Sequence, residues 1–234
     1  MDYLNQLFDL TPATPTTASM SGPIPRAEVE RQRQLDKKTY GNFEFTDAVR
    51  PSPKAKVRPS QGFRYDKYVD EESKTEIPVI MAAASREVLY SVFLQLIQQL
   101  GPVVDVVLET SHEHEVTGHC DLFREQIDLP ILTSILMEYE EMLLHDGCTG
   151  IAVLNPQTPQ EVQFDEHKLL IMYGNPLESF EKVLEQHGIN CEPAMHFITE
   201  GEHIHASNQF YREQFDLLCN TLGTEKERGG ELEA

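Results

Sequence analysis

Residues 77–109 carry the clearest hydrophobic pattern of the chain. Within this stretch, apolar residues recur at offsets of 0, 3, 4, 7, 8 and 11, the spacing of one face of an α-helix. Ser85 stands where an N-cap oxygen is needed, and Gly101 followed by Pro102 ends the run. The pattern therefore predicts a helix between residues 85 and 101 that buries Leu89, Val92, Phe93, Leu96, Ile97 and Leu100.

Short apolar runs flank this helix on both sides. Residues 78–81 and 103–108 are rich in β-branched side chains and apolar at successive positions, which is typical of strands covered on both faces. Two strands joined by a helical crossover are expected to run parallel, with a right-handed connection.

Further along the chain, apolar stripes and alternating runs predict more helices and strands. Asp128 with Pro130 begins a second helix that ends at Gly147, and Asn175 with Pro176 begins a third that ends at Gly188. The remaining expected elements are strands at 150–155, 161–165 and 167–173, a hairpin of 194–200 with 202–206 that turns at Gly201, and a fourth helix that ends at Gly223.

This order of elements predicts an α/β fold with an α+β tendency, in which a mixed β-sheet carries about four packed helices. A largely disordered N-terminal arm is expected to precede it. The predicted boundaries are an arm at 1–75, an acidic α/β domain at 76–224 and a disordered tail at 225–234. From about 129 to 222, the element order resembles that of type III secretion chaperones and related small α/β interaction domains, an analogy of order alone.

The first ten residues predict a short amphipathic helix followed by a Pro-, Thr- and Ser-rich linker. A helix this short is marginal alone, so it is expected either to pack on its own domain or to fold into a partner's groove. Its apolar face consists of Tyr3, Leu4, Leu7 and Phe8.

Charge and cysteine content indicate the kind of partner and the cellular compartment to expect. The formal charge is -20; residues 1–74 hold 12 Lys and Arg against 11 Asp and Glu, whereas residues 75–234 hold 7 against 28. An acidic domain repels nucleic acid and anionic lipid, and favours basic partners. The four cysteines are dispersed and form no CxxC pair. The sequence shows no apolar stretch long enough for a membrane helix and no secretory signal. We therefore expect a cytoplasmic protein.

Residues 50–68 interleave basic and aromatic side chains, a combination that can bind single-stranded nucleic acid. Neighbouring carboxylates, Asp47, Asp66, Asp70, Glu71 and Glu72, dilute this charge. A solvated segment that contacts the acidic domain is therefore favoured, and a nucleic-acid partner is not expected.

Histidine is the remaining candidate for chemistry, since no GxGxxG, P-loop, HExxH or GxSxG motif occurs in the chain. His112 and His114 form one HxH pair, and His203 and His205 form another. Residues i and i+2 of an extended strand point the same way, so two facing pairs would bind Zn²⁺ or another first-row transition metal. The alternative is that these are solvated or structural histidines.

These observations favour a non-enzymatic, cytoplasmic interaction or regulatory domain, adaptor-like or chaperone-like, with the helix of residues 3–10 as its docking motif and no cofactor. The expected partner is a protein that is basic or offers a hydrophobic groove; a homodimer is left open. The alternative is a metal-binding protein or metal-dependent hydrolase that uses the two HxH pairs. Whether the protein is an enzyme is left open, with a non-enzymatic role favoured.

Overall fold

The fold is an α+β arrangement built on one large sheet, seen in a computed structural model that describes residues 26–69, 74–112 and 120–226. The large sheet has eight strands in the order β12-β7-β6-β8-β9-β10-β5-β4. In chain order these strands are β4 (Gly62–Val69), β5 (Glu76–Ala83), β6 (Val103–Thr110), β7 (Cys120–Asp128), β8 (Thr149–Leu154), β9 (Glu161–Phe164), β10 (Leu170–Tyr173) and β12 (Glu225–Lys226).

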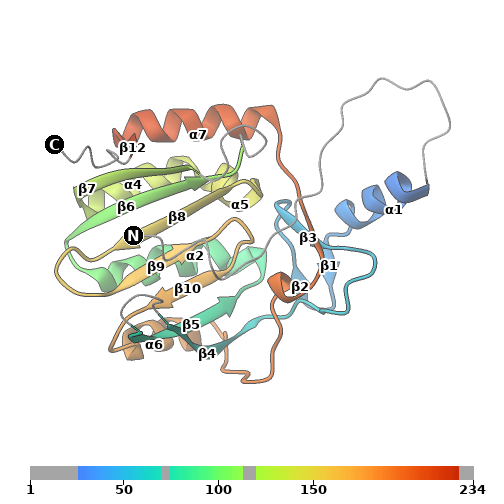
Figure 1. Ribbon diagram of the computed structural model, residues 1–234, viewed down its shortest axis with the longest axis horizontal. Coiled ribbons are helices and arrows are strands. Elements are labelled where there is room, and N and C mark those ends of the chain that lie inside the picture. Colours follow the sequence, from blue (N-terminus) through green and yellow to red (C-terminus); the bar gives the residue numbers. More distant parts are fainter. Residues whose placement is uncertain (1–25, 70–73, 113–119, 227–234) are drawn as a thin grey trace.

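Helices cover one face of this sheet (Figure 1). Alternate strand residues, among them Ile80, Val106 and Val153, point into a core shared with these helices. The helices are α2 (Arg86–Ile97), extended by the 3-10 turn η1 (Gln98–Leu100), α4 (Leu129–Glu138), α5 (Glu140–His145), α6 (Glu178–Gln186) and α7 (Gln209–Leu222). Among the described helices, none is long and apolar enough to cross a membrane.

The helix predicted after Ser85 is confirmed, with the six predicted side chains buried. Strands β5 and β6, which flank this helix in the chain, run in the same direction. Strands β8, β9 and β10 lie between them, and each of the four neighbouring pairs is antiparallel, so the direction reverses an even number of times. Three strands therefore lie between the two that the sequence predicts as a parallel pair.

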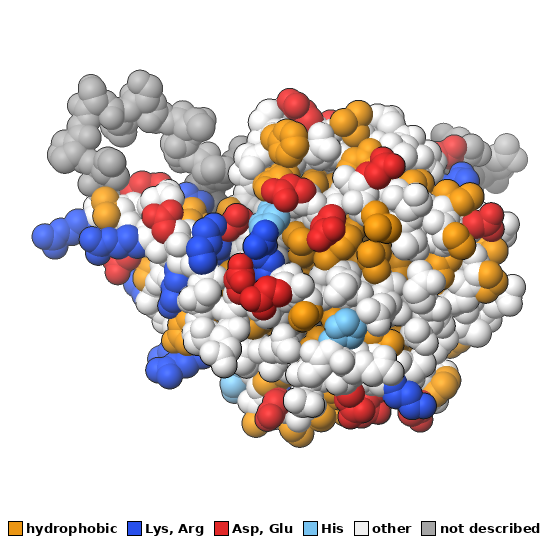
Figure 2. Space-filling model, turned by 180° about the vertical axis from the view of Figure 1, so that it is seen from behind, with side chains coloured by type: hydrophobic (Ala, Val, Ile, Leu, Met, Phe, Trp, Pro, Cys, Tyr) orange, Lys and Arg blue, Asp and Glu red, His pale blue; other side chains and the backbone are white. Residues whose placement is uncertain are grey.

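Two small sheets stand beside one end of the large sheet (Figure 1). Strands β1 (Thr39–Tyr40) and β2 (Phe43–Glu44) form the first, and β3 (Val49–Pro51) pairs with β11 (His203–His205) in the second. Helix α1 (Arg26–Leu35) lies next to β3 and carries several of the basic side chains that gather at this end of the molecule (Figure 2).

The predicted domain boundary at residue 76 is wrong, since β4 pairs with β5 along its full length as an edge strand of the large sheet. The strand is hard to recognise in the sequence because its middle is polar and residues 65–67 are exposed, although charged side chains are usual on sheet edges. The residues before 26, including the predicted docking helix, lie outside the described part of the chain, as do residues 227–234 of the predicted tail.

The basic cluster predicted at 50–68 is only partly a free surface: Lys54, Lys56 and Arg58 are exposed, whereas Arg50 and Arg64 are engaged within the fold. Arg50 is 1% exposed, and its guanidinium donates to the carbonyl oxygens of Lys37, Thr46 and Val49. Arg64 forms an ion pair with Glu200 at 2.7 Å. Two of the cations are thus committed to contacts within the fold.

The hairpin predicted for residues 194–206 is also wrong. Met195 and Phe197 are buried, which explains their strand-like alternation, but the carboxylate of Glu200 accepts the Phe197 N–H and closes the 3-10 turn η2 (Ile198–Glu200). Strand β11 pairs with β3 instead. Helix α6 begins at Glu178, later than predicted, after a cis Asn175–Pro176 bond.

Candidate metal centre

Three histidines meet at the end of the large sheet where the small sheets join it. His203 and His205 project from β11, and His167 lies in the turn between β9 and β10. The ring centroids are 4.9 Å apart for His167 and His203, 4.8 Å for His167 and His205, and 5.1 Å for His203 and His205. The alternation predicted for an HxH pair on a strand thus brings both imidazoles to one place.

The Nδ1 atom of each ring contacts an oxygen. His203 Nδ1 donates to the Gly201 carbonyl at 2.8 Å, and His205 Nδ1 donates to the Gly147 carbonyl at 2.5 Å. His167 Nδ1 lies 2.9 Å from the Asp165 carboxylate. Histidine ligands of metals usually donate their second ring N–H to a carbonyl or carboxylate in this way, which orients the ring and sets its tautomer.

With Nδ1 engaged, each ring offers Nε2 as a ligand atom. The candidate ligand atoms of the three residues lie within 4.8 Å of one another. Around zinc, tetrahedral nitrogens are about 3.4 Å apart, given a Zn–N bond of about 2.1 Å. Moving each ring by roughly 1 Å would therefore bring the three Nε2 atoms to the spacing of zinc ligands.

The turn that presents His167 is held by side-chain hydrogen bonds. Asp165 accepts the Leu169 N–H through Oδ1 at 2.7 Å and holds His167 through Oδ2. Lys168 adopts a left-handed backbone, φ 64°, and its buried ammonium donates to the Thr149 carbonyl at 2.8 Å. These contacts fix a conformation that is costly for a residue with a side chain.

Burial and charge set the protonation of the three rings. Burial lowers the pKa of His203, and it lowers the pKa of His205 to about 4. Burial also lowers the pKa of His167, but the negative charge of Asp165 and its hydrogen bond to the ring have the larger effect, and the pKa is raised. His203 and His205 are therefore neutral at pH 7, the state that binds a metal.

A second group consists of His112, Asp146 and Cys148, whose candidate ligand atoms also lie within 4.8 Å of one another. Asp146 is fully buried; its Oδ2 accepts from His112 Nε2 at 2.8 Å and from Thr149 Oγ1 at 2.5 Å, and its Oδ1 from the Cys148 N–H at 3.2 Å. Burial raises the pKa of the Cys148 thiol to about 11, so it is protonated at neutral pH. The group is internally hydrogen-bonded and fits a metal ion less well than the three histidines do.

The structure thus distributes the predicted histidines over two groups. His203 and His205 lie together with His167, whereas His112 belongs to the second group and His114 lies outside the described residues. His167 was missed because it is a single histidine in a hairpin turn. The signal that was available is Asp165 two residues earlier, at the end of an apolar strand.

A cavity of about 40 Å³ lies beside His167 and Lys168. Its walls are mainly apolar and include Phe45, Leu169 and Phe197. The space suffices for a few water molecules, given roughly 10–15 Å³ for each. Of the three histidines, His167 lines this cavity.

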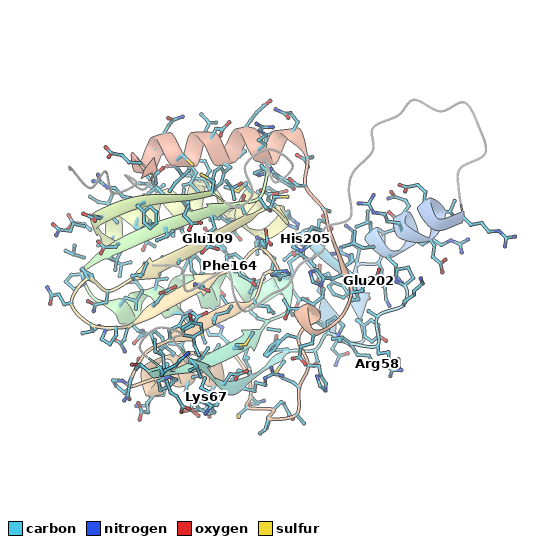
Figure 3. All side chains as sticks on the ribbon, viewed as in Figure 1. Arg58, Lys67, Glu109, Phe164, Glu202 and His205 are labelled. Carbon is cyan, nitrogen blue, oxygen red and sulfur yellow. The ribbon has the colours of Figure 1, made fainter. Side chains whose placement is uncertain are left out.

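A buried carboxyl group, Glu109, lies on β6 near the same end of the sheet (Figure 3). Its Oε1 is buried and lacks a hydrogen-bond partner among the described residues. Burial, with smaller contributions from Asp121 and Asp165, raises its pKa to about 8. The folded protein therefore retains a proton there that the unfolded chain releases above about pH 4.5.

Glu109→Gln is accordingly expected to stabilise the protein at pH 8 and to leave its stability nearly unchanged at pH 4. Since the folded pKa is raised, the stability of the parent protein falls as pH rises from about 4.5 to 8, by up to about 1.4 kcal/mol per pH unit. A gain of at least about 1 kcal/mol, or a Tm rise of roughly 2–4 °C, is expected at pH 8. Thermal unfolding at both pH values tests this, with exposed Glu125→Gln as control; equal gains at the two pH values would contradict it.

Comparisons with protein-family models, curated proteins and solved structures gave no match. The functional argument therefore depends on the geometry of the histidine group.

Proposed function

We propose that the protein binds a first-row transition metal ion, Zn²⁺ in the first instance, through the Nε2 atoms of His167, His203 and His205. The observation that carries this proposal is that all three rings converge while each Nδ1 contacts an oxygen. Solvated histidines have no reason to share that orientation. Imidazole ligands suit zinc, copper, iron and nickel.

Three protein ligands leave a fourth tetrahedral position for water or a substrate, as in catalytic zinc sites. Zinc lowers the pKa of a bound water to about 7 and so supplies a hydroxide at neutral pH. The half-buried carboxylate of Glu166, one residue before His167, accepts a hydrogen bond from Ser111 Oγ at 2.8 Å and is the nearby candidate for a general base. Hydrolysis is therefore the reaction class that this donor set supports best.

Elemental analysis of the full-length protein, purified without a histidine tag, tests the metal proposal. We expect about one equivalent of a transition metal per chain, or uptake of about one equivalent of Zn²⁺ on titration after chelation. Less than about a tenth of an equivalent by both measurements would refute a metal-binding function.

The interaction function predicted from the sequence stays a prediction, because Tyr3, Leu4, Leu7 and Phe8 lie outside the described residues. Under that hypothesis, a protein lacking residues 1–25 fails to capture its partner and keeps nearly the same Tm. Partner capture that survives the deletion would show that these residues are not the docking element.

A further inference from the structure

The second group, His112, Asp146 and Cys148, brings three different kinds of metal ligand to one place. An imidazole, a carboxylate and a thiol offer candidate ligand atoms that lie within 4.8 Å of one another. His112 follows the end of β6, and the other two residues lie in the turn between α5 and β8. Strands β6 and β8 are antiparallel neighbours in which Thr110 pairs with Thr149, so these two chain segments meet. The fold thus assembles the group from residues that are 34 positions apart in the sequence.

Hydrogen bonds orient the carboxylate at the centre of the second group. Oδ2 of Asp146 contacts His112 Nε2 at 2.8 Å and accepts from Thr149 Oγ1 at 2.5 Å. Oδ1 accepts from the Cys148 N–H at 3.2 Å. Carboxylates that bind metals are usually held by additional hydrogen bonds of this kind. The contacts from Thr149 and from the backbone therefore support Asp146 as a ligand.

The spacing within the group is close to that of a metal site. Two ligands of a tetrahedral zinc ion are about 3.4–3.6 Å apart, given Zn–N and Zn–O bonds of about 2.1 Å and a Zn–S bond of about 2.3 Å. His112 Nε2 and Asp146 Oδ2 need to separate by about 0.6 Å to reach this distance. An ion between them takes the place of the hydrogen-bond proton, and the Cys148 sulfur supplies the third ligand.

The chemistry of the ligands selects the kind of ion. Thiolate and imidazole favour zinc and other soft or borderline metals, whereas Mg²⁺ and Ca²⁺ prefer oxygen ligands. On binding, the Cys148 thiol releases its proton to water, and the ring proton of His112 moves from Nε2 to Nδ1. Because hydrogen bonds must open and a proton must leave, we expect weaker binding here than at the three histidines.

Two contacts connect the second group to the three histidines. The carbonyl of Gly147, in the middle of the turn that carries two members of the group, accepts from His205 Nδ1 at 2.5 Å. The carboxylate of Glu166 accepts from Ser111 Oγ at 2.8 Å, and each of these residues directly precedes a histidine, one in either group. The two groups therefore lie side by side at the end of the sheet where Figure 3 labels His205.

We propose that His112, Asp146 and Cys148 form a second metal site, which binds a Zn²⁺ ion beside that of the three histidines. The protein then holds two ions at one end of its large sheet, the second of them through a thiolate. This inference goes beyond the proposed function, since the two sites share no ligand and each can be tested without the other.

Co²⁺ is the probe for the second site, because a thiolate bound to Co²⁺ gives an intense near-ultraviolet charge-transfer band that a site of histidines alone does not give. The full-length, reduced protein is freed of metal with a chelator and then titrated with Co²⁺. We expect the first equivalent to produce only the weak visible bands of the histidine site. A second equivalent, taken up at higher Co²⁺ concentration, should add the charge-transfer band.

Three variants assign this band. Cys148→Ser should abolish it and reduce Co²⁺ uptake from about two equivalents to about one. Cys191→Ser is the matched control, because Cys191 is exposed and belongs to neither group, and it should keep the band. His205→Ala should weaken binding of the first equivalent and retain the band, so failure of the histidine site and failure of the second site give different results.

Two results would overturn the proposal: a titration with excess Co²⁺ that never produces the band, and a band that Cys148→Ser retains. Far-ultraviolet circular dichroism confirms that each variant is folded. Should Cys148→Ser unfold, His112→Gln decides in its place. A band that then needs at least about tenfold more Co²⁺ supports the second site, and a band with the parental Co²⁺ dependence refutes it.

Discussion

Replacing His205 by alanine is expected to weaken Zn²⁺ binding by more than about 100-fold. Loss of a residue that only orients a metal ligand costs 10–100-fold in affinity, and loss of the ligand itself should cost more. His205 is a strong choice because its ring lies about 5 Å from both other rings and is oriented by the Gly147 carbonyl. Competition with a chromogenic chelator measures the affinity.

His196→Ala is the matched control for this experiment. His196 pairs with Glu200, its side chain is 70% exposed, and it belongs to neither histidine group. We expect it to bind Zn²⁺ as the parent does. Equal losses in the two variants would show that the ion binds somewhere other than at the three histidines.

Gly147→Ala is expected to lower the Tm by roughly 2–12 °C and to weaken Zn²⁺ binding. An alanine Cβ at this position would lie 2.3 Å from the Ala48 carbonyl oxygen and 2.9 Å from that of Ala206. Both are backbone atoms, so two chain segments must separate. Overpacking of this kind costs about 1–3 kcal/mol, at roughly 2–4 °C per kcal/mol for a chain of this size. The carbonyl that orients His205 belongs to the same residue.

Gly188→Ala is a control in which no atom crowds the added Cβ and the histidine group is not touched. Gly188 has φ 69°, and nothing lies within 4 Å of an added Cβ, so only the left-handed backbone is penalised, by about 1–2 kcal/mol. Differential scanning fluorimetry with and without Zn²⁺ gives both Tm values. A Gly147→Ala protein with the parental Tm and Zn²⁺ affinity would mean that the three segments are not tightly packed.

The helices could be predicted from the sequence where their apolar face and both ends were marked. Helix α2 is an example: it begins directly after Ser85, and its 3-10 extension ends at Gly101, which has φ 107°. Strand β4 could not be predicted, because apolar and polar residues alternate only weakly in an edge strand, which also carries charged side chains on its exposed side. The neighbours of β5 and β6 in the sheet could not be predicted either, since the intervening strands come later in the chain.

Only part of the candidate site follows from local pattern. The HxH pair on β11 was visible because residues i and i+2 share a face of a strand. The contribution of His167 depends on the turn built by Asp165, and the separation of His112 from the other histidines depends on its hydrogen bond with buried Asp146. Such pairings join residues far apart in sequence, and a single sequence does not specify them.

The pairing of β11 with β3 has a consequence for the smallest piece of the chain that can hold an ion. Val49 and Pro51 are the partners that keep His205 and His203 in an extended strand. A fragment cut at the predicted boundary, residues 76–224, would contain every histidine ligand but lack the backbone that aligns two of them. Under the metal-binding proposal, the smallest fragment that binds an ion therefore starts ahead of residue 49, well inside the region that the sequence assigns to an arm.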